Sequence, residues 1–130
     1  MKVYLELDEH KTLCQILLEP TRIYVKPIIK LLHQYKVKKV VSGMAHITGG
    51  GIGGNVVRSI GNDVDATIHL DRFEVPSIFS FLQQEGNIDI EEMYNVFNMG
   101  IGYVLIVRPA FADSIATHLK HSGENPILLG

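Results

Sequence analysis

Apolar side chains recur along the chain with two periods, one typical of helices and the other typical of strands. After Pro27, which suits the first turn of a helix, apolar residues follow at spacings that place them on one face: Ile28, Leu31, Leu32 and Tyr35. Similar stripes, proline starts and glycine ends predict further helices over residues 76–86, 89–97 and 109–122, and a turn or two of helix is expected over residues 12–19 before Pro20. A short helix over residues 56–60 is expected as well, with Asn55 as its cap.

Strand patterns lie between these helices. Residues 40–47 are rich in β-branched side chains, and residues 103–107 form an unbroken apolar run that predicts a central strand. Residues 63–71 alternate strictly between apolar and polar side chains, which predicts a half-buried strand. Shorter strands are expected over residues 1–8 and 127–129. Together these elements predict one α/β (α+β) domain, in which a mixed sheet of about four strands carries its helices mainly on one face.

The composition is that of an ordinary globular domain. With 130 residues and 46% hydrophobic side chains, the chain can bury one stable core. A formal net charge of −2 gives no general attraction to nucleic acid or to an anionic membrane, so neither is expected as a partner. Cys14 is the only cysteine, which excludes an internal disulfide and fits a reducing compartment. Because no apolar leader follows Met1, we expect a cytoplasmic protein.

One stretch is unusually rich in glycine, with five glycines among the six residues 49–54. The missing side chains let another body approach the backbone, and several N–H groups are free to converge on an anion. Thr48 and Asn55 could add neutral donors and Arg58 a positive charge, which predicts a site for a phosphoester. A glycine-rich turn that serves only tight packing explains these residues equally well.

Two more specific phosphate motifs are weaker explanations of the same stretch. Gly49, Gly51 and Gly54 satisfy the Gly-x-Gly-x-x-Gly dinucleotide pattern, and Asp71 lies near the distance expected for a ribose-binding carboxylate. The match carries little weight, because a window this rich in glycine produces it almost automatically and the helix expected after it is short. No Gly-Lys-Ser/Thr follows, so a P-loop is excluded.

His46 is the candidate for proton transfer. It precedes Thr48 in the alternation of the predicted strand and could reach the same ligand as general acid or base near neutral pH. The competing explanation is a histidine packed in the core, which is the commoner situation on an apolar strand.

No metal site is expected. His69 shares a predicted strand face with Asp65 and Asp71, but all three come from one strand, so a polar surface is favoured over a metal shell. His118 and His121 lie three residues apart on the last predicted helix and are expected to be solvated.

Several segments resemble one family in the same order along the chain. The main ones are residues 18–27 (LEPTRIYVKP), 44–51 (MAHITGGG) and 97–102 (FNMGIG), with residues 75–83 and 86–94 between them. This ordered set resembles the aminoimidazole ribonucleotide (AIR) synthetases, also called phosphoribosylformylglycinamidine cyclo-ligases. The likeness covers about residues 11–130 and corresponds only to the C-terminal half of such an enzyme.

The resemblance implies a domain organisation and a reaction. Residues 1–19 would be an appendage and connector, and residues 20–130 an AIR synthetase C-terminal domain. The implied reaction is the ATP-dependent ring closure of formylglycinamidine ribonucleotide to aminoimidazole ribonucleotide in purine biosynthesis. ATP and Mg²⁺ would be bound mainly by an N-terminal half, supplied by the same gene product or by a separate chain. An isolated chain is expected to be inactive and to self-associate as a homo-oligomer.

The resemblance also implies roles for particular residues. His46 would lie close to the chemistry, and the loops would bind substrate and its phosphate through Thr48, Gly49, Gly50, Gly51, Asn55, Asn98, Gly100 and Gly102. Arg22 and Lys26 of the connector are further candidates for the cleft. Phe73 stands where the family often has tryptophan, which changes packing and not chemistry. Two alternatives stay open: a stand-alone module that binds a ribonucleotide without catalysis, and a purely structural interaction domain.

Overall fold

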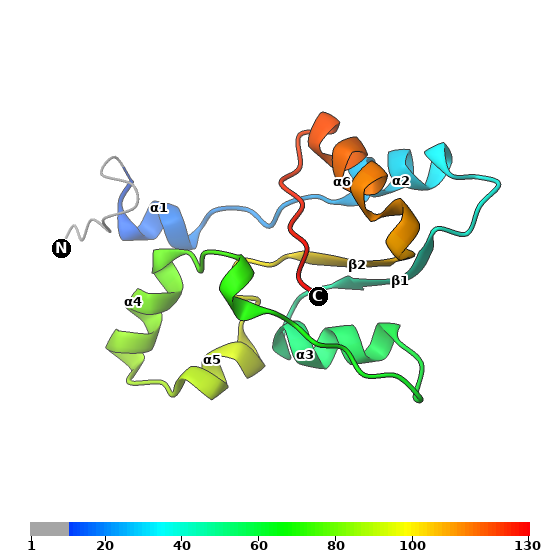
Figure 1. Ribbon diagram of the computed structural model, residues 1–130. Coiled ribbons are helices and arrows are strands. Elements are labelled where there is room, and N and C mark those ends of the chain that lie inside the picture. The colour runs from blue at the N-terminus through cyan, green and yellow to red at the C-terminus, as the bar shows by residue number, and fades with distance from the viewer. Residues whose placement is uncertain (1–10) are drawn as a thin grey trace.

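A computed structural model describes residues 11–130 (Figure 1). Its helices and strands are α1 (Leu13–Leu17), α2 (Val25–Gln34), β1 (Val41–His46), α3 (Gly51–Val56), α4 (Ser77–Gly86), α5 (Ile90–Val96), β2 (Tyr103–Val107) and α6 (Ala112–His121). Short 3-10 helices cover Val57–Ser59, Leu70–Arg72 and Pro109–Phe111. The predicted mixture of helices and strands is confirmed.

The sheet in the described part of the chain has two strands. β1 and β2 pair antiparallel, from Val41 opposite Val107 to His46 opposite Tyr103, with an irregularity between Val41 and Gly43. The prediction of about four strands is wrong. The strands predicted over residues 40–47 and 103–107 are confirmed as β1 and β2, whereas those predicted over residues 63–71 and 127–129 are absent.

The alternating pattern of apolar and polar residues predicted a strand over residues 63–71 that the structure does not have. Residues 63–69 form no strand, and within this segment only Ile68 is even half-buried. Alternation leads to a strand only where a partner strand pairs with the segment, and among the described residues β1 and β2 pair only with each other. Residues 127–129 form no strand either, although the His69 N–H donates to the Leu129 carbonyl at 2.7 Å and Arg72 Nη1 donates to the Leu128 carbonyl at 3.2 Å. The strand predicted over residues 1–8 lies outside the described residues.

Two apolar clusters hold the helices to the two strands. The first comprises Leu31, Val40, Ile115 and Leu119, and joins α2 and α6 to one side of the sheet. The second comprises Ala45, Ile47, Ile52 and Val56, and joins α3 to the other side. Neighbouring residues of a strand face opposite ways, so Leu105 contacts the first cluster and Val104 the second. Helices therefore lie on both sides of the sheet rather than mainly on one (Figure 1).

Most helix predictions are confirmed to within a few residues. Thr12 caps α1 in a reciprocal capping box with Gln15, and Pro76 immediately precedes α4. α6 starts at Ala112, because residues 109–111 after the predicted proline start form a 3-10 turn first. Asp89 occupies the N-cap position of α5 but makes no side-chain cap hydrogen bond there.

The helix next to the glycine stretch begins earlier than predicted. α3 already starts at Gly51 inside the stretch, and residues 57–59 continue it as a 3-10 turn. Asn55 therefore lies within the helix, and the expectation that it caps a helix over residues 56–60 is wrong. The cap position belongs to Gly50, whose φ of 98° is readily available only to glycine. The glycine stretch thus forms the turn and the helix start together.

Candidate functional site

A cavity of about 430 Å³ lies at the end of β1. Residues from three distant parts of the chain line it: Glu19, Thr21, Arg22 and Tyr24 from the connector, His46, Ile47 and Thr48 from the end of β1, and Asn98 and Gly102 from the loop before β2. Its size is that of a small-molecule site. The three segments that line it are the three main segments that carry the family resemblance.

Two aromatic side chains that line the cavity, Tyr24 and His46, pack together with a third, Tyr103. His46 and Tyr103 are cross-strand partners, and their rings stack at 6.1 Å between centroids with an interplanar angle of 27°. Tyr24, just before α2, meets the His46 ring edge-on at 5.9 Å and the Tyr103 ring at 5.3 Å. The exposed His46 side chain thus packs against two tyrosines at the surface and is not buried in the core. An imidazole in this position can take or give a proton at a ligand in the cavity.

The loop before β2 is shaped to admit Tyr24. A Cβ on Gly102 would coincide with the Tyr24 phenol oxygen, so only glycine leaves room for the ring. Asn98 turns the loop, because its Oδ1 accepts from the Gly100 N–H at 3.0 Å and its carbonyl accepts from the Ile101 N–H at 2.9 Å. These contacts give Gly102 and Asn98 a structural role alongside their place in the cavity wall.

The two basic connector residues behave differently. Arg22 lines the cavity, but its Nη2 donates to the Gly123 carbonyl at 3.0 Å and lies 3.0 Å from Glu124 Oε2. The guanidinium therefore fastens the connector to the end of α6. Lys26 is exposed on α2 and does not line the cavity. Of the two, only Arg22 is placed to contact a ligand there.

The glycine loop, residues 48–51, lies beside the cavity and packs on α5. Gly51 has a φ of 63°, and a Cβ there would collide with the Tyr94 carbonyl oxygen. Gly49, Gly53 and Gly54, in contrast, have open space where a side chain would stand. Packing therefore requires glycine at position 51, but it does not explain glycine at positions 49, 53 and 54.

The carbonyls and the N–H groups of the glycine loop differ in their hydrogen bonding. The Thr48 carbonyl accepts from the Gly51 N–H at 3.2 Å, and the Gly50 carbonyl accepts from the Gly54 N–H at 3.1 Å. Within the described chain, the N–H groups of Gly49 and Gly50 donate to no protein group. The loop carbonyls thus accept hydrogen bonds from within the protein, while two N–H groups remain free. Such a surface is suited to binding an anion.

The predicted site residues are thus brought together only in part. The cavity gathers His46, Thr48, Asn98, Gly102 and Arg22. The other predicted residues, Gly49, Gly50, Gly51, Asn55, Gly100 and Lys26, do not line it. Their binding roles stay predictions.

The site residues predicted from the sequence do not include four that line the cavity, Glu19, Thr21, Tyr24 and Ile47. Glu19 lines the cavity and lies 3.4 Å from Lys11 through its Oε2. Tyr103 stacks on His46. The cross-strand register places Tyr103 there, and an apolar run such as residues 103–107 does not reveal its partner strand.

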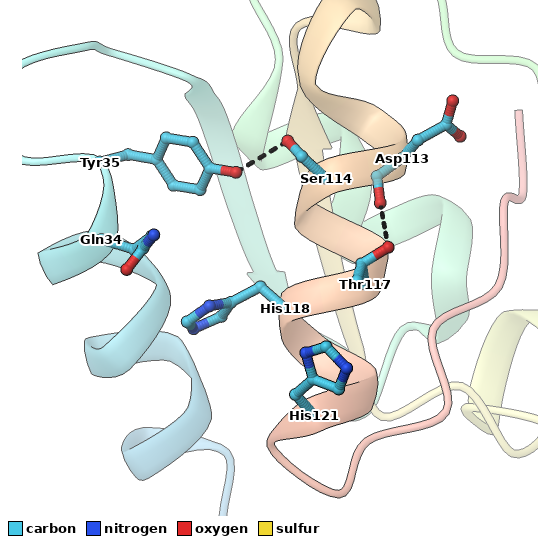
Figure 2. A pocket seen from close by; sticks show the side chains of 7 residues that line it. All are labelled: Gln34, Tyr35, Asp113, Ser114, Thr117, His118 and His121. Atoms are coloured by element: carbon cyan, nitrogen blue, oxygen red, sulfur yellow. Dashed lines mark hydrogen bonds between the residues drawn. The ribbon is translucent and has the colours of Figure 1, made fainter.

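A second hollow, of about 450 Å³, lies between α2 and α6 (Figure 2). Its lining residues are Gln34, Tyr35, Asp113, Ser114, Thr117, His118 and His121. Its hydroxyl groups are already bonded, Tyr35 to Ser114 at 2.7 Å and Thr117 to the Asp113 carbonyl at 2.9 Å. None of the predicted site residues reaches it, so we place the functional site in the first cavity.

His118 departs from its expected solvation. Its Nε2 is shielded from solvent and has no hydrogen-bond partner among the described residues, while His121 is exposed as expected. In the described part of the chain, no group of three histidine, cysteine or acidic side chains is placed to hold a metal ion. No helix among residues 11–130 is both long and apolar enough to cross a membrane.

Comparison with known proteins gives a consistent result. Residues 3–126 match the sequence family described as "AIR synthase related protein, C-terminal domain". Among curated relatives, the phosphoribosylformylglycinamidine cyclo-ligase of Alkaliphilus metalliredigens is 43% identical over 120 residues, which is 92% of this chain and 33% of the relative. The enzymes of the same name from Chromobacterium violaceum and Neisseria gonorrhoeae are 45% and 44% identical, over 95% and 96% of this chain and 34% and 35% of their own lengths.

The chain thus spans about a third of the length of these relatives. The family match covers the connector, both glycine-containing loops and both strands, which are the parts that build the cavity. This chain belongs to the AIR synthase family and represents its C-terminal domain.

Proposed function

We propose that this chain is the C-terminal, substrate-phosphate-binding part of a phosphoribosylformylglycinamidine cyclo-ligase. The observation that carries the proposal is the glycine loop, with the free N–H groups of Gly49 and Gly50, directly beside the cavity that holds His46. The names of the relatives supply the reaction class, a ring-closing ligation. The substrate would be formylglycinamidine ribonucleotide, and the pathway de novo purine biosynthesis.

In this proposal the loop and the cavity share one ligand. The N–H groups of Gly49 and Gly50 and the Thr48 hydroxyl bind the phosphate of the ribonucleotide, as backbone nests do. Asn98 and Gly102 line the space for the rest of the substrate. His46 stands at the cavity wall as a general acid or base for the nitrogen that closes the ring.

The phosphoryl chemistry requires more than this chain. In the expected reaction the formyl or amide oxygen of the substrate takes a phosphoryl group from ATP. A nitrogen of the amidine then attacks the carbon that carries this oxygen, and phosphate leaves as the imidazole forms. Mg²⁺ is usually bound by one or two carboxylates together with substrate phosphates. The cavity offers one carboxylate, Glu19, which already faces Lys11, so its residues do not by themselves fit a magnesium site. We propose that ATP and Mg²⁺ are bound mainly by an N-terminal portion.

The surface near the connector is consistent with such a partner. Several large apolar side chains are well exposed there, including Leu18 at 74%, Ile23 at 76% and Val25 at 61%. Exposed apolar side chains gathered in one region are typical of surfaces that another protein covers. We propose that the ATP-binding portion covers this region in the complete enzyme, and that copies of this chain self-associate through it otherwise.

The proposal can be tested by reconstitution. We expect this chain, combined with the separately expressed N-terminal two-thirds of the Chromobacterium violaceum relative, to release ADP when formylglycinamidine ribonucleotide is added. Either component alone should release none. If both components are folded and associate, yet no substrate-dependent ADP appears, the cyclo-ligase proposal is contradicted.

A second candidate is a binding module without catalysis. The cavity of about 430 Å³ and the free N–H groups of the loop beside it favour a site that binds a small anionic ligand. Tight binding of a ribonucleotide by the chain, combined with an inactive reconstituted pair, would support this candidate over the enzyme.

A further inference from the structure

The Asn55 side chain lies beneath the glycine loop. It is 7% exposed, and it is the one buried polar side chain among the described residues. Its Nδ2 donates to the carbonyl oxygens of Gly51 at 2.8 Å, Gly49 at 3.2 Å and Thr48 at 3.3 Å. An amide nitrogen carries two hydrogens, so these three carbonyls share them. The nitrogen is therefore fully used within the loop and is not free to donate to a ligand.

We infer that Asn55 is a positioning residue that turns the N–H groups of the glycine loop outward. In a planar trans peptide, the carbonyl of one residue and the N–H of the next point in opposite directions. Holding the carbonyls of Thr48 and Gly49 inward therefore directs the N–H groups of Gly49 and Gly50 outward. The same geometry at Gly51 directs the Ile52 N–H outward. The inference rests on the proposed phosphate-binding function for the identity of the ligand, but not for the geometry.

A device of this kind is needed because the loop lacks side chains. Glycine peptides can rotate to present either a carbonyl or an N–H on the outer side, since no Cβ restricts them. An outward carbonyl would repel an anion. Asn55 removes this alternative by bonding the carbonyls from below, and α3 supports it because Val56 and Ile52 anchor the helix in the core.

Hydrogen exchange on the whole chain tests the geometry without any ligand. Asn55→Asp keeps the shape but replaces the donating nitrogen with an accepting oxygen, and Asn55→Ala removes the group. Both variants should speed exchange of the Gly51 and Gly54 amides by about tenfold or more, because their bonds to Thr48 and Gly50 depend on the ordered loop. The Ile47 amide, which bonds to Gly102 in the core, should be unchanged. Asn62→Asp, in an exposed turn, is the matched control.

Kinetics of the reconstituted enzyme test the link to binding. In Asn55→Asp the KM for formylglycinamidine ribonucleotide should rise about tenfold or more, with a much smaller change in kcat, because uniform binding is lost. Lowering the pH should reduce this defect relative to wild type, since a protonated carboxyl can donate to a loop carbonyl again. Asn55→Ala has no proton to regain, so its defect should not recover.

The outcomes separate the two claims. Unchanged exchange at Gly51 and Gly54 in both Asn55 variants would overturn the positioning role, whatever the enzyme does. Equal acceleration at Ile47 would also overturn it, because Asn55 would then stabilise the whole domain. An inactive wild-type pair would contradict the proposed function alone, and the exchange comparison would still decide the role of Asn55.

Discussion

Replacing Gly51 by alanine should strongly destabilise the domain, by about 2–5 kcal/mol. Alanine at a φ of 63° costs about 1–2 kcal/mol, and forcing extra volume into packed structure costs about 1–3 kcal/mol. The added Cβ would meet the Tyr94 carbonyl oxygen, so α3 and α5 would have to separate. Urea unfolding of the purified variant measures the effect. This loss is a large fraction of a typical total stability of about 5–15 kcal/mol.

Gly53→Ala is the matched control for this prediction. Gly53 lies in the same helix, its φ is not in the left-handed region, and a Cβ there meets nothing within 4 Å. Alanine should therefore stabilise the helix by about 0.5–1 kcal/mol. Equal effects of the two substitutions on the free energy of unfolding would contradict the claim that Gly51 packs closely on α5.

Replacing His46 by alanine should abolish most activity of the reconstituted enzyme while leaving the fold intact. General acid–base catalysis contributes about 10²–10⁴-fold, so kcat should fall by that factor if His46 transfers a proton. The ring is exposed and belongs to neither apolar cluster, so the unfolding midpoint should change little. Substrate-dependent ADP release measures kcat.

Two further variants make the His46 result specific. His33→Ala removes an exposed histidine on α2, away from the cavity, and should keep full activity. Tyr103→Phe keeps the ring that stacks on His46 and removes only the hydroxyl, so its effect should be small. A His46→Ala enzyme with unchanged kcat would exclude proton transfer by this residue.

The helices could be predicted from sequence because their signals are local. Proline starts, glycine ends and apolar stripes near Pro27, Pro76 and Gly123 act within a few residues, and helices stand close to where these signals placed them. The sheet could be predicted only in part. The strand expected over residues 63–71 needed a partner strand, and whether one is available is a property of the whole fold.

The site shows the same division between local and distant information. His46, Thr48, Asn98 and Gly102 were identified through motifs and do meet at one cavity. Tyr103 was missed because its contact with His46 depends on strand register. Asn55 was predicted as a helix cap and a donor to the phosphate, but only the folded loop shows that its amide nitrogen donates to three loop carbonyls.

The central claim is that the glycine loop binds the phosphate of a ribonucleotide. The most direct measurement is a ¹H–¹⁵N spectrum of the chain titrated with formylglycinamidine ribonucleotide, in which each backbone amide is followed separately. We predict that the amides of Gly49 and Gly50 shift first and furthest, together with those of the cavity residues Thr48 and Gly102. Unchanged loop amides, or shifts confined to the hollow between α2 and α6, would contradict the claim.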